Sequence, residues 1–262
     1  MSKMMTKVVT ALVLIAICLP PIIFGGKLMN VLLLVVSALA SYEIASLQDQ
    51  KPHWVFTVLC FIAINVISYV SEVFVGASIS IWLVVLFVAE IVDDKLSTSY
   101  VMYPFALTCL VGFALRCVLK IYTFDLGPYI LLYVLLACFV CDTGAYFFGV
   151  SIGKHKMIER ISPNKTWEGA IGGYLTALVV SLAFGLIVLD AMPKELIICG
   201  SIVLPAIGEI GDLAFSSIKR KFKIKDFGNL LPEHGGVLDR VDSLIFCLMV
   251  FNALMILWRL IG

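Results

Sequence analysis

The sequence predicts an all-α fold: a polytopic integral membrane bundle of about nine transmembrane helices. Of its 262 residues, 61% are hydrophobic and 14% are charged, against about 45–50% and about 25% in soluble domains. The mean hydropathy is +1.07. Its apolar runs are continuous rather than alternating, which favours membrane helices over the strands of a barrel.

The individual spans follow from the length of each apolar run, since crossing the bilayer takes about 20 residues. The predicted spans are residues 7–24, 28–47, 54–70, 78–92, 103–119, 128–149, 169–189, 195–215 and 243–261. The fourth is short, and the fifth carries Arg116. The first run resembles a signal peptide, but Pro20 and Pro21 stand in place of a small-residue cleavage site, so we expect it to be retained.

The basic residues predict an orientation. The N-terminus and the loops after even-numbered spans carry 14 of the 19 Lys and Arg residues. Because basic loops stay on the cytoplasmic side, we expect the N-terminus and these loops to be cytoplasmic, and the C-terminus to lie outside. The expected location is the inner membrane of a bacterium.

Residues 1–137 are predicted to be a transmembrane scaffold, and residues 138–262 a catalytic region, because polar clusters begin only near Cys138. Cys138 and Cys141 have CxxC spacing but no second pair, so we expect them to be small packing residues. Asp142 lies deep in the sixth predicted span, where an ionised carboxylate is costly without a cation, a metal or water. It would either pair with one basic residue of a neighbouring helix or line a polar cavity.

A second polar segment begins at Ser162 and precedes the seventh span. Ser162 and Pro163 resemble an ordinary helix start, and Thr166 a helix cap. That interpretation does not require Lys165, whose ammonium beside free helix-start amides would favour an anion such as phosphate. Gly169, Gly172 and Gly173 would allow close helix packing.

The third segment is the end of the eighth span. At 100° per residue, one helical face there carries Glu209, Asp212, Ser216, Lys219 and Lys223. A basic collar attracting anionic lipids would explain the lysines. It would not explain the acids, which lie deeper in the membrane.

Beyond this face, glycines and a proline break the helix before residue 238 and allow close approach of a ligand. Asp239 and Asp242 follow one turn apart, on either side of Arg240. Either acid alone could simply favour a helix N-terminus. Together with Asp212 they suggest a magnesium site, since hard oxygen ligands lie near basic residues. His234 is either a turn residue or a substrate contact.

Carboxylates beside Lys and Arg at one membrane face suit phosphoryl or nucleotidyl transfer between a lipid and a soluble phosphate compound. The sequence has no GxxxxGK[ST] or HExxH motif to indicate another reaction. The segments DTGAYFFG and SPNKTWEG precede a longer pattern, S-x-x-K-R-x4-K-D-x-G-x2-L-P-x-H-G-G-x2-D-R-x-D, over residues 216–242, and the segment GEIGDLAFSSIKR leads into its start. Together they resemble the signature of the phosphatidate cytidylyltransferase (CDP-diacylglycerol synthase) family.

This resemblance implies an enzyme of phospholipid biosynthesis that joins CTP and phosphatidic acid into CDP-diacylglycerol and pyrophosphate, with Mg²⁺ and room for a second cation. It implies a metal centre of Asp212 and Asp239, with Asp142 and Asp242 as nearby acids; of these two, we expect Asp142 to be the further metal ligand. The residues expected to take part in catalysis are Asp212, Asp239, Lys219 and Asp242. Those expected to bind substrate are Ser162, Lys165, Thr166, Ser216, Arg220, Lys225, His234 and Arg240.

The partners expected are therefore CTP, phosphatidic acid and membrane lipid, with no nucleic acid; a homodimer is left open. One alternative is a CTP-dependent lipid-alcohol kinase, which would transfer the γ-phosphate instead. Another is a transporter of an anionic solute, since buried acids and broken helices also line transport paths. The concentration of polar residues at one membrane face argues against a transport path.

Overall fold

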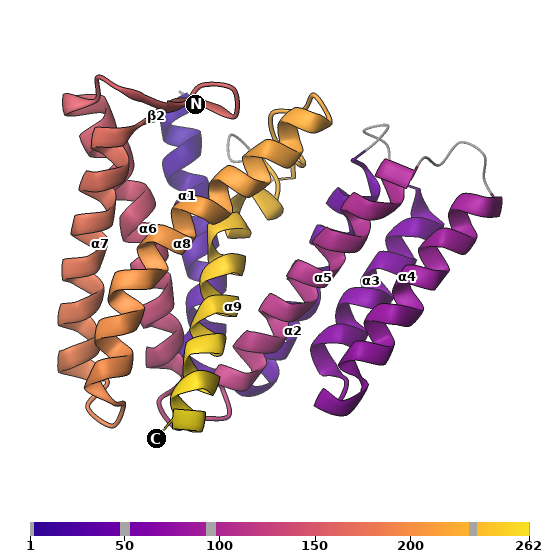
Figure 1. Ribbon diagram of the computed structural model, residues 1–262, viewed down its shortest axis with the longest axis horizontal. Helices are drawn as coiled ribbons and strands as arrows, with labels where there is room; N and C mark the ends of the chain where they lie inside the picture. The colour runs from indigo at the N-terminus through magenta and orange to yellow at the C-terminus, as the bar shows by residue number, and fades with distance from the viewer. Residues whose placement is uncertain (1–2, 48–52, 93–97, 231–234, 262) are drawn as a thin grey trace. The chain divides into compact units, whose positions relative to one another are not determined.

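The computed structural model describes residues 3–47, 53–92, 98–230 and 235–261 (Figure 1). Within these ranges the nine predicted spans are nine α-helices, and a short β-hairpin is added. Seven helices of this described part are long and apolar enough to cross a membrane. The prediction of an all-α integral membrane protein is confirmed.

The chain forms two compact units: unit 1 is Met1–Leu119 with Asp226–Asp239, and unit 2 is Lys120–Lys225 with Arg240–Gly262.

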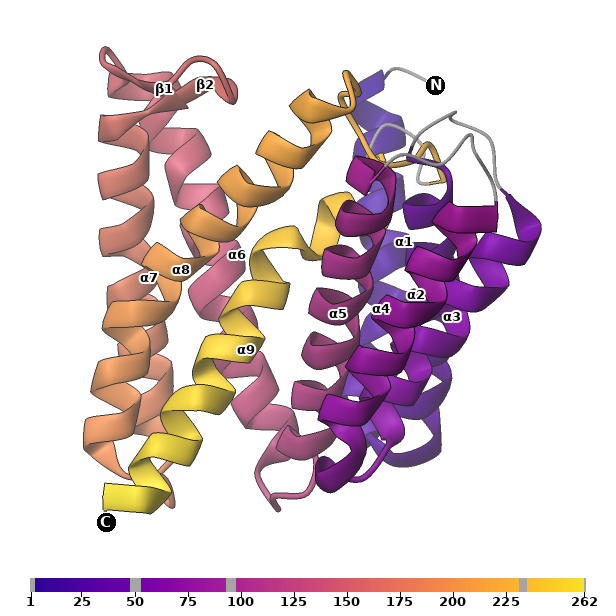
Figure 2. The same ribbon diagram turned by 45° about the vertical axis from the view of Figure 1, so that its right-hand side comes forward.

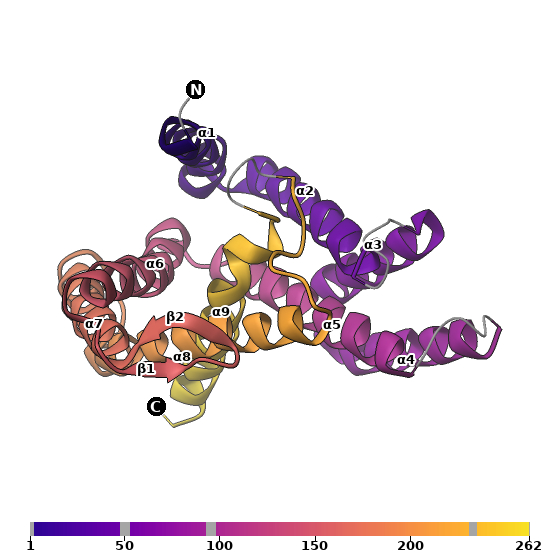
Figure 3. The same ribbon diagram turned by 90° about the horizontal axis from the view of Figure 1, so that it is seen from above.

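Unit 1 is built from the N-terminal helices. They are α1 (Lys3–Phe24), α2 (Gly26–Ala45), α3 (Trp54–Tyr69), the 3-10 turn η1 (Glu72–Phe74), α4 (Val75–Val92) and α5 (Thr98–Ile121). Helices α2 and α3 lie side by side (Figure 3). Asn65 of α3 donates to Ser37 Oγ of α2 at 3.0 Å, and Trp82 of α4 donates to Thr108 of α5 at 2.6 Å. These side-chain bonds satisfy polar groups that lipid would not.

Arg116, the basic residue within a predicted span, has a structural explanation. Its guanidinium donates to the carbonyls of Ile67 and Val70, at 3.2 and 2.5 Å. The last carbonyls of a helix have no partner within the helix. Arg116 therefore caps the C-terminus of α3.

Unit 2 holds most of the polar residues. Its elements are α6 (Gly127–Ile152), β1 (Lys156–Ile158), β2 (Ser162–Thr166), α7 (Trp167–Val188), α8 (Lys194–Lys221) and most of α9 (Leu238–Ile261). Helices α6 and α7 pack closely along their length (Figure 2). A Cβ on Gly144 would lie 3.0 Å from the Cα of Gly173, and one on Gly169 would lie 3.1 Å from the Cα of Gly149. The predicted small-residue packing is thus confirmed.

The segment between α6 and α7 decides between two interpretations of Ser162 and Pro163. Ser162 and Pro163 do not start a helix: they lie in β2, which pairs antiparallel with β1. Thr166, at the end of β2, does cap α7, because its Oγ1 accepts the Gly169 N–H at 3.2 Å. Glu168 accepts from the His155 ring nitrogen at 2.5 Å and so joins the start of the hairpin to α7.

The polar face of α8 is also shorter than predicted. The helix ends at Lys221, and Lys223 has a left-handed backbone with φ 56°. Lys223 therefore does not continue the face formed by Glu209, Asp212, Ser216 and Lys219. The cysteines behave as predicted, since Cys138 and Cys141 are both fully buried.

Candidate active site

A lysine from the hairpin meets two acids from α8 within unit 2. Lys165 Nζ lies 2.5 Å from Glu209 Oε2 and 2.7 Å from Asp212 Oδ2. Burial alone would lower the pKa of Lys165, but the Asp212 and Glu209 carboxylates outweigh it and hold this pKa above its usual range. Lys165 therefore stays cationic and neutralises part of the acidic cluster.

Asp142 joins this group from α6. It is half-buried, and it interacts electrostatically with Lys165 and with the carboxylates of Glu209, Asp212 and Asp242. A one-to-one pair with a neighbouring base does not describe this environment, because acids surround Asp142 as well. We call Asp142, Lys165, Glu209, Asp212 and Asp242 the acid cluster.

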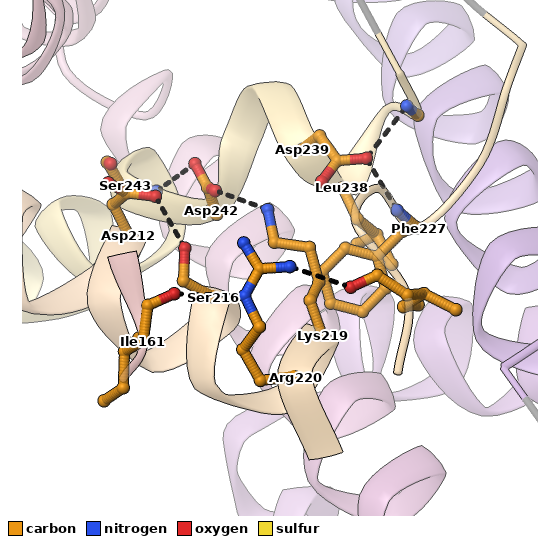
Figure 4. Close-up of polar contacts among 12 residues, drawn as sticks. Ile161, Asp212, Ser216, Lys219, Arg220, Phe227, Leu238, Asp239, Asp242 and Ser243 are labelled. Atoms are coloured by element: carbon orange, nitrogen blue, oxygen red, sulfur yellow. Dashed lines mark hydrogen bonds and ion pairs between the residues drawn. The ribbon is translucent and has the colours of Figure 1, made fainter. Parts of the chain in front are cut away.

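The next turns of α8 continue the cluster, as the close-up shows (Figure 4). Ser216 Oγ donates to Asp212 Oδ1 at 3.4 Å, and Lys219 Nζ lies 4.0 Å from Asp242 Oδ2. Lys219 and Asp242 are each 8% exposed. Helix α9 can approach α8 closely here because Gly211 has no side chain. A Cβ at that position would lie 3.1 Å from the Asp242 carbonyl oxygen.

Other predicted phosphate-binding residues lie around the cluster. Arg220 is exposed, and its guanidinium donates to the carbonyls of Ile161 and Ile224, both at 3.1 Å. It thereby joins the hairpin to the end of α8 (Figure 4). Lys225 and Arg240 are exposed, and Ser162 is half-buried in β2.

The segment Asp226–Asp239 belongs to unit 1 and is described within that unit. Asp239 is 8% exposed, and its Oδ2 accepts the N–H groups of Phe227 at 2.8 Å and Gly236 at 2.9 Å. Gly235 has φ 81°, a conformation that favours glycine, and its Cβ would lie 3.0 Å from Asp239 Oδ2. The backbone thus folds around the Asp239 carboxylate. The predicted substrate contact His234 lies outside the described residues.

Sequence reasoning missed Glu43. This acid of α2 is fully buried in unit 1, where its two carboxylate oxygens accept the N–H groups of Val237 at 2.7 Å and Leu238 at 2.8 Å. An acid within an apolar span is itself a signal of function. The prediction treated residues 1–137 as scaffold and overlooked it.

The donor chemistry of the acid cluster fits a hard cation. If all four carboxylates of the cluster are ionised, they carry four negative charges. Lys165 within the cluster and Lys219 beside it carry two positive charges, which leaves a net charge of −2. Among the described residues, no three His, Cys, Asp or Glu side chains are grouped as a complete metal site. Mg²⁺ usually takes one or two carboxylates, with water and substrate phosphates completing its coordination. Asp212 and Asp142 are residues of the kind that could supply one or two carboxylates to such an ion, were one bound.

Comparison with known proteins assigns this chain to a family. The profile of the cytidylyltransferase family matches residues 5–258. The chain therefore belongs to the cytidylyltransferase family, and the polar residues described above lie in an integral membrane enzyme of that class.

Its relatives specify the kind of cytidylyltransferase it resembles. A phosphatidate cytidylyltransferase from Staphylococcus saprophyticus is 30% identical over 263 residues, covering 97% of this chain and 99% of the relative. One from Staphylococcus haemolyticus is 32% identical over 260 residues, with the same coverage. The same enzyme from Staphylococcus aureus is 45% identical over 130 residues, half of each chain.

Proposed function

We propose that this enzyme joins CTP and phosphatidic acid to give CDP-diacylglycerol and pyrophosphate. Family membership and the full-length relatives support this reaction. The observation that carries it is the acid cluster, in which residues of α6, β2, α8 and α9 converge. Buried carboxylates and lysines gathered at one place in a membrane protein suit two phosphate-bearing substrates better than they suit packing.

The chemical step is an in-line displacement. An oxygen of the lipid phosphate forms a bond to the α-phosphorus of CTP, while the bond from that phosphorus to the β-phosphate bridging oxygen breaks. Pyrophosphate leaves with the electron pair. Since a phosphomonoester has a second pKa of about 6, the attacking oxygen is already largely ionised at neutral pH. No strong general base is required.

The residues of the chain have distinct tasks in this step. Lys219 and the exposed bases Arg220, Lys225 and Arg240 bind phosphate oxygens and orient the two anions. Lys165 holds Glu209 and Asp212 in place and contributes positive potential. Ser162, Thr166 and Ser216 offer hydroxyl groups for substrate binding.

Asp212 and Asp142 are the residues of unit 2 proposed to hold Mg²⁺, with Asp242 nearby; Asp239, from the signature, is proposed as a further ligand. When bound, the cation supplies Lewis-acid neutralisation of charge on the phosphates. A second cation remains part of the proposal. We place the N-terminus and the acid cluster on the cytoplasmic side of a bacterial inner membrane, as the distribution of Lys and Arg predicts.

Isotope labelling tests the reaction. Purified protein with phosphatidic acid, Mg²⁺ and α-labelled CTP should transfer label to the lipid and release pyrophosphate, while γ-labelled CTP should not label the lipid. Label transferred only from the γ position would establish the kinase alternative. Uptake of an anionic solute by vesicles without pyrophosphate release would favour a transporter.

A substitution tests the proposed metal ligand. Asp239→Asn should abolish cytidylyl transfer while the protein remains folded in detergent, because it removes a negative ligand and keeps the shape of the side chain. Near-normal turnover in that variant would refute the role of Asp239.

A further inference from the structure

A buried acid of the second helix holds the segment that precedes α9. Glu43 is 0% exposed, and both of its carboxylate oxygens accept backbone N–H groups, from Val237 and Leu238. All three residues belong to unit 1. Hydrogen bonds from backbone N–H groups to a carboxylate are stronger than bonds between neutral groups, and fixing two of them sets the orientation of the segment.

The glycines around Glu43 indicate how closely the segment approaches it. A Cβ on Gly236 would lie 2.6 Å from the Glu43 carboxylate, and a Cβ on Gly228 would lie 3.0 Å from Glu43 Oε1. A Cβ at Gly236 would require the Glu43 carboxylate to move, so the absence of a side chain at Gly236 lets the carboxylate lie directly against the backbone. Residues of the sequence signature thus fit around a side chain 185 or more positions away in the sequence.

The same segment fixes Asp239. Its Oδ2 accepts the N–H groups of Phe227 and Gly236, and Gly236 immediately precedes Val237, which Glu43 holds. One chain of contacts therefore runs from the Glu43 carboxylate, through the backbone of residues 236–238, to the Asp239 carboxylate.

We propose that Glu43 is a positioning residue of cytidylyl transfer, which acts by setting the backbone of residues 236–238 and through it the orientation of Asp239. The proposal rests on the catalytic role given to Asp239 under Proposed function. Residues that orient metal ligands typically change activity or metal affinity about 10–100-fold when they are replaced.

The test compares Glu43→Gln with Ser41→Ala. Glu43→Gln keeps the shape of the side chain but turns one acceptor oxygen into an NH₂ group that opposes a backbone N–H. Ser41 is also fully buried in α2, but its hydroxyl donates to Ser37 O of the same helix, so its loss should leave the segment unchanged. The activity of both variants is expressed per molecule of folded protein, which is isolated by size-exclusion chromatography in detergent.

Two readouts separate positioning from a purely structural role. Glu43→Gln should lower kcat by about 10–100-fold and raise the Mg²⁺ concentration needed for half-maximal activity. Hydrogen–deuterium exchange, without substrate or metal, should accelerate at Val237 and Leu238 and also at Phe227 and Gly236, which Asp239 holds. Ser41→Ala should match the unsubstituted protein in all of these measurements.

Different failures have different meanings. If Asp239→Asn is inactive but Glu43→Gln keeps kcat and Mg²⁺ dependence within about twofold, the inference on Glu43 is overturned and the proposed function stands. Faster exchange confined to Val237 and Leu238 would also overturn it, because the effect would not reach Asp239. If Asp239→Asn is fully active, both the role of Asp239 and the inference fail.

Discussion

Replacing Lys165 by methionine should destabilise unit 2 strongly, because Lys165 separates acids that would otherwise repel one another. Its ammonium lies 2.5 Å from Glu209 and 2.7 Å from Asp212. Side-chain exposures are 19% for Lys165, 9% for Glu209 and 27% for Asp212. Methionine keeps most of the apolar stem, so the change removes mainly the charge.

The magnitude follows from this burial. Removing one partner of a buried ion pair costs about 3–5 kcal/mol, because the other charge remains without compensation. Since all three side chains keep some contact with solvent, we expect the lower end, about 3 kcal/mol. This corresponds to a shift of roughly 150-fold in the unfolding equilibrium. The melting temperature in detergent should fall by about 6–12 °C.

A double-variant cycle tests the cause of that loss. Neutralising one acid as well, in Lys165→Met with Glu209→Gln, should restore at least about 1 kcal/mol relative to Lys165→Met alone, since one uncompensated charge disappears. Lys221→Met is the matched control, because Lys221 is exposed at the end of α8; it should change stability by less than about 0.5 kcal/mol. Two results would refute the reasoning: equal stability of Lys165→Met and Lys221→Met, or a double variant less stable than Lys165→Met.

Three other predictions use thermal unfolding in detergent. Gly173→Ala should lower the free energy of unfolding by about 1–3 kcal/mol, because the new Cβ would meet the Cys141 carbonyl oxygen. Gly76→Ala is the control: nothing lies within 4 Å of its Cβ, so the free energy of unfolding should stay the same or rise by up to about 1 kcal/mol. Equal effects of the two substitutions would contradict the close packing of α6 and α7. Thr166→Ala should cost about 1 kcal/mol through loss of the α7 cap, and retained stability would argue against the cap. Because the pKa of Lys165 is raised by folding, its contribution is complete below the unfolded value of about 10.4 and is lost only as pH rises through the higher folded value. The stability difference between the unsubstituted protein and Lys165→Met should therefore not narrow between pH 7.5 and 9.5.

Sequence alone predicted the helices well because each span depends on local composition. It also identified the face of Glu209, Asp212, Ser216 and Lys219, since helical periodicity is local as well. Lys223 was wrongly added to that face because the end of α8 depends on one left-handed residue. The 3.6-residue periodicity of polar side chains does not itself predict the residue at which a helix ends.

Contacts between distant residues were not predictable in the same way. Ser162 and Pro163 match a helix start as well as they match a strand, and only the pairing of β2 with β1 decides between them. Glu43 accepts from Val237, 194 positions along the chain, and no local pattern relates the two. The pairing of Lys165 with Asp212 likewise depends on how the hairpin lies on α8.

The polar residues of the described spans fall into two kinds that differ in energy. In one kind, partners satisfy each other, as when Tyr133 donates to Ile197 O at 2.8 Å and lies 2.9 Å from Ser201 Oγ. Such bonds join helices and stabilise the bundle. In the other kind, Asp142, Asp212 and neighbouring acids gather with fewer lysines, and their mutual repulsion opposes folding. Helix packing gains nothing from that excess of negative charge, so we propose a cationic ligand as its physical reason; the Mg²⁺ proposed above to accompany CTP would meet that requirement.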